Sequence, residues 1–566
     1  MRKVHEKQSK ENAVYYDAVA KARKAAGKSK GGFLPGRRQA VAEKELFAKQ
    51  LAAGIKFSEY KKVKVEVSGK DFEQVSQPLE AFADLASKRG FVIPPFLDRN
   101  IKLMQYVTPT PIQSYALPVA LAKRDLMCCA QTGSGKTCAF LFPIVVKLGN
   151  SRQGKKKDIP WSNRFDQDAA APVALVLAPT RELAIQIEVE AQKLANGSGI
   201  VASVVYGGAS VRGQLLKLAD GVDILVATPG RLQDFADRNL VSLSKIEYLV
   251  LDEADRMLDM GFEPQIRRIV ERSGMPPPQR RRTFMFSATF PLNIQKLAGS
   301  FMQNYIWIGV GRVGSTVSSI EQRLLLATNN KRDKLDLLHQ VLFKKDSHCP
   351  RTLVFVKKKS TARWVAKQIR NDSRFKTTSS EIHGDRSQSQ RESALQAFRD
   401  GDIRVLVATD VAARGLDINN VEHVVNFDLG STPDDFDSYV HRIGRTGRAG
   451  NTGLATSFYV PGNDPKAGSG RIAGSLLRLL RESKQNVPQW FLDLPEVRNV
   501  AGGARGKKRQ FGGHDARSQA ISARSKRPPS SPRQKTQKSN RAKQNIKQPS
   551  KRRGNPSQKA GKNARQ

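Results

Sequence analysis

The chain has 566 residues and a formal net charge of +44 at pH 7, with 96 lysines and arginines against 52 acidic residues. This length exceeds what one hydrophobic core normally supports, so two or more domains are expected. The charge excess favours a polyanionic partner, either nucleic acid or an anionic membrane surface. No apolar run reaches the ~18 residues of a membrane span, and the first residues lack the apolar core of a secretory signal. Four cysteines without a paired metal-ligand spacing disfavour a disulfide framework and fit a reduced intracellular compartment.

The N-terminal half is predicted to contain a basic extension followed by an α/β domain. Residues 1–75 are rich in Lys, Ala and Glu, so helical pieces such as residues 38–51 and a short strand near residues 61–67 are expected, without an independent core. Over residues 76–312, short apolar runs alternate with glycine-containing turns and helical stretches, which predicts a parallel sheet covered by helices. Residues 151–171 interrupt this pattern and are interpreted as a surface loop. The strand candidates are residues 126–130, 173–178, 201–206, 224–227, 248–251 and 283–286.

The C-terminal half repeats the α/β pattern. A Gly- and Ser-rich stretch at residues 309–319, with residues 313–319 as the linker proper, precedes a second α/β domain over residues 320–465. Residues 466–500 form a helical extension, in which residues 471–483 place apolar side chains on one helical face. Residues 501–566 hold twenty lysines and arginines against one acid, so this tail is expected to be disordered and to add sequence-independent affinity for a polyanion. The strand candidates of the second domain are residues 353–356, 405–408 and 423–427.

A phosphate-binding loop is predicted at residues 130–137, A-Q-T-G-S-G-K-T, because this segment follows a strand candidate and precedes an apolar helix. Gly133 and Gly135 allow backbone N–H groups to turn toward phosphate oxygens. Lys136 supplies a charge to the β- and γ-phosphates, and the Thr137 hydroxyl can ligate Mg²⁺. A chance glycine-rich turn is the alternative, but G-K-T after a strand disfavours it. The predicted ATP-binding residues of this loop are Gln131, Thr132, Gly133, Ser134, Gly135, Lys136 and Thr137.

The apolar run at residues 248–251 ends in the acidic cluster D-E-A-D at residues 252–255. An isolated cluster of this kind is most simply a solvated turn. Downstream of a phosphate loop, however, an Asp at a strand end is the second metal-binding element of P-loop ATPases. Asp252 is therefore predicted to share Mg²⁺ with Thr137, partly through water, and Glu253 to polarise the attacking water. The two motifs together predict ATP hydrolysis.

Further motifs occur in a fixed order along both predicted domains. Alone, T-P-G-R would be an ordinary turn with a helix cap, and H-R-I-G-R-T-G-R a basic nucleic-acid-binding helix. Their order outweighs these alternatives. The motifs are Y-V-T-P-T-P-I-Q (106–113), A-P-T-R-E-L (178–183), G-G (207–208), T-P-G-R (228–231), S-A-T (287–289), H-G-D (383–385) with Q-x-x-R (388–391), A-T-D-V-A-A-R-G-L-D (408–417) and H-R-I-G-R-T-G-R (441–448).

With these motifs, the chain resembles the DEAD-box ATP-dependent RNA helicases, closest to the Ded-like and Vasa-like branch, over roughly residues 82–494. The resemblance implies two tandem RecA-like parallel-sheet domains that use ATP and Mg²⁺. It implies that Gln113 hydrogen-bonds adenine and Tyr106 stacks on it, while the upstream aromatic is either Phe82 or Phe91. Near the ribose, the resemblance places Gly415 and Asp417.

The same resemblance assigns residues to RNA binding, coupling and catalysis. RNA backbone contacts fall to Pro179, Thr180, Arg181, Gly208, Thr228, Pro229, Gly230, Arg231, Gln388, Arg391 and Thr409. Coupling of hydrolysis to strand separation falls to Asp255, Ser287, Thr289, Asp410, His441 and Arg442. Arg445 and Arg448, three apart on one helical face, are the arginine-finger candidates. The catalytic set is then Lys136, Asp252, Glu253, Arg445 and Arg448.

The expected activity is RNA-stimulated ATP hydrolysis coupled to local duplex unwinding or ribonucleoprotein remodelling. An ATP-gated RNA clamp uses the same motifs and remains an alternative, whereas a DNA helicase fits the charge but not the motif set. The expected partners are single-stranded and short duplex RNA, bound without sequence preference, together with ribonucleoprotein or translation factors. A monomeric core without membrane attachment is expected, in the cytoplasm or the nucleus, including the nucleolus.

Overall fold

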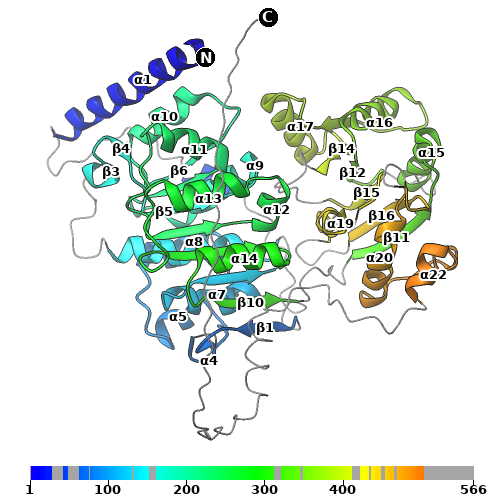
Figure 1. Cartoon of the computed structure of the whole chain (residues 1–566), viewed down its shortest axis with the longest axis horizontal. Coiled ribbons are helices and arrows are strands. Elements are labelled where there is room, and N and C mark those ends of the chain that lie inside the picture. The colour runs from blue at the N-terminus through cyan, green and yellow to red at the C-terminus, as the bar shows by residue number, and fades with distance from the viewer. Residues whose placement is uncertain are drawn as a thin grey trace, which may run out of the picture. The chain divides into compact units, whose positions relative to one another are not determined.

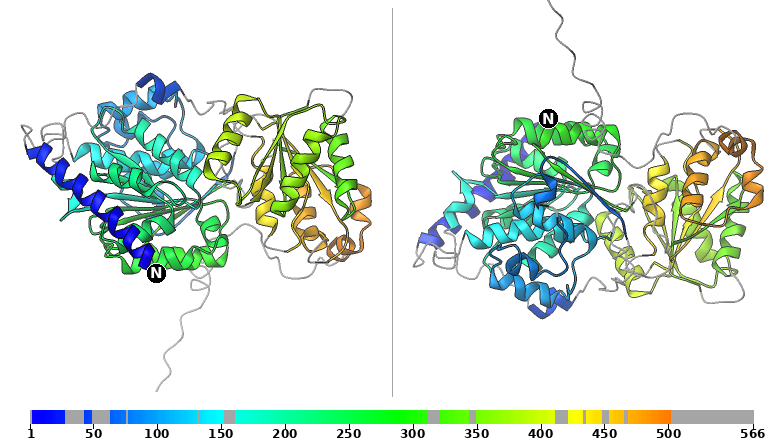
Figure 2. Two further views of the ribbon diagram at one scale, coloured as in Figure 1. Left: turned by 90° about the horizontal axis from the view of Figure 1, so that it is seen from above. Right: turned by 90° about the horizontal axis from the view of Figure 1, so that it is seen from below.

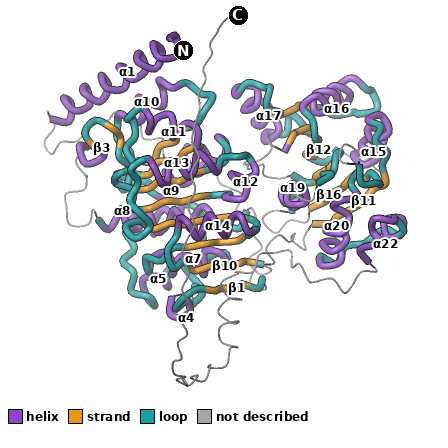
Figure 3. The backbone as a smooth tube through the Cα atoms, in the orientation of Figure 1, coloured by secondary structure: helices purple, strands orange, loops and turns teal. Residues whose placement is uncertain are grey.

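The computed structural model describes residues 2–27, 43–48, 63–75, 77–130, 133–151, 161–311, 320–343, 349–410, 421–432, 435–447, 453–464 and 468–501 (Figure 1). Two sheets flanked by helices account for most of these residues, and Figure 3 shows the strands of each sheet bracketed by helices. None of the helices in these segments is long and apolar enough to cross a membrane. The predicted tail beyond residue 501 lies outside the described residues.

Eight strands form the first sheet in the described part of the chain, in the order β1-β10-β2-β9-β8-β5-β7-β6. Each neighbouring pair is parallel, except that β1 runs antiparallel to β10. This arrangement confirms the predicted parallel sheet, and the predicted strands at residues 224–227 and 248–251 coincide with β7 and β8. The bounds are β1 Val65–Ser68, β2 Leu126–Cys129, β5 Ala174–Leu177, β6 Ala202–Val205, β7 Ile224–Ala227, β8 Tyr248–Leu251, β9 Arg282–Ser287 and β10 Ile306–Val310.

Helices cover both faces of the first sheet, because its strands carry apolar side chains on both sides. Along β2, Leu126 and Cys128 join one core while Met127 and Cys129 join the other. The first core is completed by α6 Pro95–Leu103, α7 Pro111–Leu121, α8 Lys136–Asn150 and α9 Arg181–Leu194. The second is completed by α1 Arg2–Gly27, α10 Val211–Ala219, α11 Pro229–Asp237, α12 Ala254–Asp259, α13 Glu263–Arg272 and α14 Leu292–Phe301. Short helices are α2 Glu43–Ala48, α4 Phe72–Val75 and α5 Asp84–Ser87.

The second sheet has six strands among the described residues, all parallel, in the order β11-β16-β15-β12-β14-β13. One helical layer, α15 and α16, packs on one face, while α17, α19 and α20 pack on the other. The predicted helix at residues 471–483 is confirmed as α20. The two parallel sheets, one after the other along the chain, form the expected tandem RecA-like architecture. The bounds are β11 Ile320–Leu326, α15 Lys331–Leu342, β12 Thr352–Val356, α16 Lys359–Asn371, β13 Ser379–Ile382, α17 Gln388–Asp400, β14 Val405–Thr409, β15 His423–Asn426, α19 Asp435–Ile443, β16 Gly453–Tyr459, α20 Gly470–Glu482, α21 Gln489–Leu492 and α22 Pro495–Ala501.

Several elements differ from the sequence expectations. Gly309 belongs to β10 rather than to a linker, and a Cβ there would collide with the Trp307 ring, so this glycine serves packing. The described part of the expected loop forms a 3-10 turn, Trp161–Arg164, and a small hairpin of β3 Phe165–Asp166 and β4 Ala169–Ala170. From the expected N-terminal extension, β1 joins the first sheet and α1 packs on α10 (Figure 2). The described part of the predicted helix at residues 38–51 is α2.

Candidate active site and nucleic-acid interface

The strand order of the first sheet determines which motifs are neighbours. The phosphate loop, S-A-T and D-E-A-D follow β2, β9 and β8, which are adjacent in the sheet. The motifs A-P-T-R-E-L, T-P-G-R and G-G follow β5, β7 and β6, the next three strands. Because these strands are parallel, all six motifs lie at one edge, where open α/β sheets bind ligands. The motifs predicted for nucleotide binding and coupling therefore occupy one half of this edge, and the motifs predicted for RNA binding occupy the other.

The described part of the phosphate loop is held in the geometry of an anion site. Gly133 and Gly135 both have left-handed backbones, with φ of 78° and 90°, which favours glycine at both positions. Gly135 caps the N-terminus of α8, whose helix dipole favours an anion. Buried Lys136 donates from Nζ to the Ala130 carbonyl at 2.9 Å, so the lysine folds back over the loop. Gln131 and Thr132 lie outside the described residues, while Ser134 is buried.

The predicted adenine-binding residues contact the phosphate loop directly. Thr110 caps α7, with a reciprocal bond in which the Thr110 N–H donates to Gln113 Oε1 at 2.9 Å. Gln113 Nε2 donates to the Gly135 carbonyl at 3.1 Å. The Tyr106 ring stacks on Phe82, with centroids 6.5 Å apart and planes 16° apart, so the structure favours Phe82 as the upstream aromatic. These contacts bring the adenine motif and the phosphate loop into one site.

The carboxylates after β8 have opposite electrostatic properties. Burial raises the pKa of Asp252 to about 7, against the opposing effect of Lys136. Burial also acts to raise the pKa of Glu253, but Arg256 and other nearby cations outweigh it and hold that pKa below its usual value. Arg256 Nη1 donates to Glu253 Oε2 at 2.8 Å. Glu253 has φ of 52°, an uncommon backbone for a side chain of its size, and such strain concentrates at functional sites.

The donor set at the end of β8 fits a divalent cation. Asp252 is buried, and its Oδ1 accepts the Glu253 N–H at 3.0 Å. A buried carboxylate is costly unless a cation or hydrogen-bond donors offset its charge. Thr137, at the start of α8, supplies a hydroxyl of the type that Mg²⁺ prefers. The residues present therefore suit the predicted Mg²⁺ position between Thr137 and Asp252.

Asp255 connects the acidic cluster to S-A-T. Its Oδ2 accepts from the Ala288 N–H at 3.1 Å, and from the Thr289 N–H and Thr289 Oγ1 at 3.0 Å each. His441 Nε2 lies 3.8 Å from the same oxygen. Ser287 Oγ is buried without a hydrogen-bond partner in the described structure, so it has bonding capacity left for a ligand or water. Asp255 is thus a hydrogen-bond hub rather than a metal ligand.

The RNA motifs of the first sheet begin two of its helices. Thr180 caps α9 by accepting the Leu183 N–H at 3.3 Å, and Thr228 and Pro229 begin α11. Arg181 packs against Gly208, where a Cβ would collide with the guanidinium group. The structure therefore brings A-P-T-R-E-L and G-G into contact at the N-terminus of α9, and a helix N-terminus favours phosphate groups. Pro179, Gly230 and Arg231 lie in the same turns, and Arg231 Nε is 4.0 Å from Asp234 Oδ2.

The second sheet contributes the remaining motifs from its own strand ends. Thr409 ends β14 and is buried, and the next residue, Asp410, accepts a bidentate bond from Arg442 at 2.5 Å to each oxygen. Burial disfavours the charge of Arg442, but Asp410 outweighs this effect and raises the pKa of the arginine. Arg391 Nη2 lies 2.7 Å from Glu182 Oε1.

The described structure tests only some of the second-domain predictions. Arg445 of the motif at residues 441–448 is buried. Gly415, Asp417 and Arg448 lie outside the described residues, and Gln388 is described only in its backbone, as the first residue of α17.

Two functional residues escaped the sequence analysis. Arg256 is 1% exposed and neutralises Glu253, and Glu190 Oε2 accepts from the Tyr106 hydroxyl at 3.5 Å. The i,i+3 spacing of Glu253 and Arg256 was the available signal for the first pair. No local spacing relates Tyr106 to Glu190, because they come from different elements.

Comparison with known proteins identifies the relatives of this arrangement. Residues 110–297 match the family model "DEAD/DEAH box helicase", and residues 333–450 match "Helicase conserved C-terminal domain". The chain is similar to S. cerevisiae Dbp5 bound to RNA and ADP BeF3, with 29% identity, 70% of this chain and 94% of that chain covered, and a TM-score of 0.56. It is also similar to the yeast DEAD-box splicing factor Prp28, with 34% identity, 80% and 95% covered, and a TM-score of 0.41.

Proposed function

Because this chain belongs to the DEAD/DEAH box helicase family, we propose that it couples ATP hydrolysis to the local unwinding of RNA duplexes or the remodelling of RNA–protein complexes. The main support is the adjacency of the nucleotide and RNA motifs at one edge of the first sheet. The Asp255 hub adds a direct connection between the acidic cluster and S-A-T.

The residues of the nucleotide half have distinct roles in this proposal. Tyr106 and Gln113 hold the adenine, while Gly133, Gly135 and Lys136 hold the phosphates. When bound, Mg²⁺ supplies charge neutralisation at the β- and γ-phosphates, held by Thr137 and Asp252, partly through water. Glu253, kept ionised by Arg256, orients and polarises the attacking water. Arg445 and Arg448 stabilise the charge that develops on the γ-phosphate, and Gly415 and Asp417 adjoin the ribose.

RNA is proposed to bind through its sugar-phosphate backbone, so binding without sequence preference is expected. Helix N-termini after β5 and β7, with Arg181 and Arg231, take phosphates on the first sheet, and Gln388, Arg391 and Thr409 extend the contact on the second. An RNA that contacts both sets favours the state in which the arginines meet the phosphate loop, so RNA stimulates hydrolysis. By linkage, ATP tightens RNA binding to the same extent.

We further propose a branch of the family, a compartment and protein partners for this chain. The sequences of the motifs resemble those of the Ded-like and Vasa-like branch. The four cysteines are free and buried, which suits a reduced compartment, the cytoplasm or the nucleus including the nucleolus. Ribonucleoprotein or translation factors are the proposed protein partners of a monomeric core, and the basic tail is proposed to tether RNA through counterion release.

One experiment separates this function from an ATP-gated clamp. ATP hydrolysis is measured with RNA, with DNA and without nucleic acid, alongside unwinding of a short duplex, for the wild type, Lys136→Ala and Glu253→Gln. RNA-specific stimulation with unwinding, lost in both variants, supports the proposal. Stimulation of ATP hydrolysis by RNA without unwinding favours the clamp. Equal stimulation by DNA contradicts the assignment of RNA as the ligand. If neither RNA nor DNA stimulates hydrolysis, the proposed enzymatic activity is contradicted.

A further inference from the structure

An N-terminal helix packs on the first sheet domain without belonging to any of the motifs above. Tyr15, Val19, Ala22 and Ala26 of α1 are buried and recur every three to four residues, which places them on one helical face. They join the core that contains α10, and the ribbon of α1 runs beside α10 (Figure 1). α1 is therefore an integral layer of the domain rather than a solvated extension.

Specific polar contacts fix the position of α1. The Tyr15 hydroxyl donates to the Asp168 carbonyl at 2.8 Å and accepts the Ala170 N–H at 3.0 Å. Arg23 pairs with the carboxylate of Asp168 in the same β3–β4 hairpin. Because the Tyr15 hydroxyl is buried, loss of either partner would leave a polar atom unsatisfied. The hairpin thus fixes the register of α1 on the domain.

A second group of polar contacts connects α1 to Arg238, which directly follows the helix that carries T-P-G-R. Arg238, directly after α11, donates from Nε to Asn12 Oδ1 at 2.9 Å and from Nη1 to Glu11 Oε2 at 3.2 Å. Its side chain is 9% exposed and that of Glu11 is 17% exposed. Arg238 Nη1 also lies 3.4 Å from Asp234 Oδ2. α1 therefore supplies Arg238 with a second carboxylate in a largely buried position.

Asp234 is shared between Arg231 of α11 and Arg238, which directly follows that helix. Its Oδ2 lies 4.0 Å from Arg231 Nε and 3.4 Å from Arg238 Nη1. Both guanidinium groups also lie over the Phe235 ring, at 5.3 and 5.8 Å from its centroid. Burial lowers the pKa of Arg231, and Asp234 and then Glu11 oppose that shift. Without Glu11, Arg238 would have Asp234 as its remaining carboxylate in this network, and Arg231 would lose part of its counter-charge.

We propose that α1 is an intramolecular brace for the RNA-contacting turn at residues 228–231, with Glu11 and Arg238 as positioning residues that leave Asp234 available to orient Arg231. The inference rests on the proposed function, because it takes RNA as the ligand of this turn. Neither Glu11 nor Arg238 is proposed to touch RNA.

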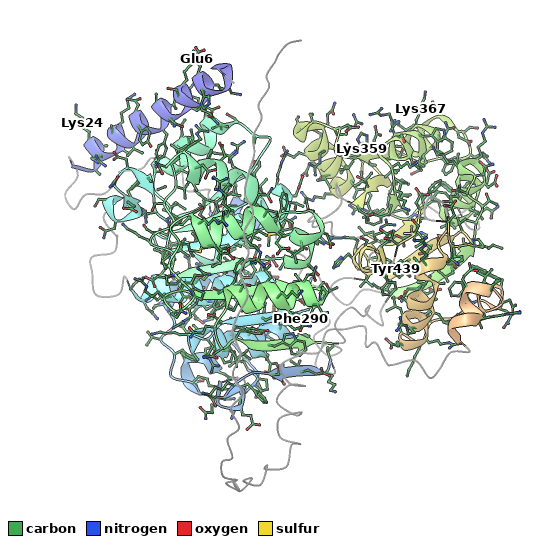
Figure 4. All side chains as sticks on the ribbon, viewed as in Figure 1. Glu6, Lys24, Phe290, Lys359, Lys367 and Tyr439 are labelled. Carbon is green, nitrogen blue, oxygen red and sulfur yellow. The ribbon has the colours of Figure 1, made fainter. Side chains whose placement is uncertain are left out.

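A matched pair of substitutions tests the brace. Glu11→Gln and Glu6→Gln remove the same charge from the same helix, but Glu6 is 65% exposed, pairs with Lys10, and points away from the domain (Figure 4). Loss of a negative charge alone would tighten binding of polyanionic RNA in both variants. The brace predicts the opposite for Glu11→Gln, about a threefold to tenfold rise in the RNA concentration that half-saturates ATP hydrolysis, with kcat at saturating RNA unchanged. Glu6→Gln is expected to match the wild type or bind slightly tighter.

Two further measurements identify the route and separate this inference from the proposed function. In an Asp234→Asn background, Glu11→Gln should add little, because both changes act on Arg231. Amide hydrogen exchange at residues 228–237, measured without RNA, should be faster in Glu11→Gln than in Glu6→Gln. If wild type is not stimulated by RNA, the proposed function fails, and the exchange result still decides the brace. If the two variants agree in both measurements, the brace is wrong.

Discussion

The hub at Asp255 makes a quantitative prediction for the substitution Asp255→Asn. Oδ1 accepts the Arg256 N–H at 3.0 Å, and Oδ2 accepts three donors from Ala288 and Thr289. An asparagine side chain has one oxygen in place of two. If that oxygen accepts the S-A-T donors, the NH₂ group of the asparagine faces the Arg256 N–H, so two donors meet with no acceptor between them. One buried donor is then unsatisfied, at about 1–3 kcal/mol, and three bonds lose the roughly twofold advantage of a charged acceptor. The expected loss of unfolding free energy is about 3–5 kcal/mol, which a domain of ordinary stability survives.

The control is Asp259→Asn, which makes the same chemical change at an exposed position of the same helix, α12. Urea unfolding should separate the two variants by the amount above. Because the hub connects the acidic cluster to S-A-T, duplex unwinding per ATP hydrolysed should fall about tenfold or more in Asp255→Asn, since ~1.4 kcal/mol of coupling is worth that factor. Equal midpoints for the two variants, with equal unwinding per ATP, would refute this account.

Two further substitutions test the phosphate loop and the interior of the second sheet domain. Gly135→Ala should abolish nucleotide binding, because the φ of Gly135 is 90° and an added Cβ would lie 2.6 Å from Gln113 Nε2. Titration with a fluorescent ATP analogue measures this loss. Retained affinity would contradict the contact between Gln113 and the phosphate loop. His423 is buried, and burial lowers its pKa to about 3. Between about pH 3 and about pH 6.5, this histidine therefore binds fewer protons in the folded protein than in the unfolded chain. The free energy of unfolding should therefore fall as the pH drops below 6.5, by about 2 kcal/mol at pH 5. Urea titrations at pH 7.5 and pH 5 measure this loss, and His423→Gln should remove it. An identical pH dependence in the variant would exclude His423 as the source of the loss.

The sheet strands that were predicted correctly share one property. Residues 224–227 and 248–251 are continuous apolar runs with polar ends, as expected for strands buried on both faces. Two of the strands that the sequence did not predict, β11 and β13, lack that signature. β11, I-E-Q-R-L-L-L, alternates buried and exposed positions over its first residues because it lies at a sheet edge, and β13, S-S-E-I, is short and polar. Edge and polar strands are determined by pairing with distant segments, which local composition does not report.

The site could be predicted to the level of motifs but not of contacts. Lys136, Asp252 and Asp255 follow from spacing and resemblance, and the structure places each at the expected strand end. That Asp255 accepts three bonds from S-A-T depends on β8 and β9 being neighbours, which is a property of the strand order. The packing of α1 on the domain was not predicted either, because its apolar face consists of small residues and one tyrosine. In addition, the surface that it packs on includes the hairpin at residues 165–170, which is distant in sequence.

Helix α9 joins the two halves of the ligand-binding edge in a way that neither motif reveals alone. Its N-terminus follows Thr180, which is predicted to contact RNA, and about 15 Å along the helix Glu190 accepts a hydrogen bond from the Tyr106 hydroxyl. Lys193 donates to Glu190 at 3.0 Å, and this ion pair is buried, so the contact has little freedom to adjust independently of the helix. A rigid helix that contacts Tyr106 of the predicted adenine site near one end and follows the predicted RNA-binding residue Thr180 at the other requires both ends to move together. We therefore expect adenine occupancy to bias the position of Thr180 through α9, in addition to any coupling through the Asp255 hydrogen bonds to S-A-T.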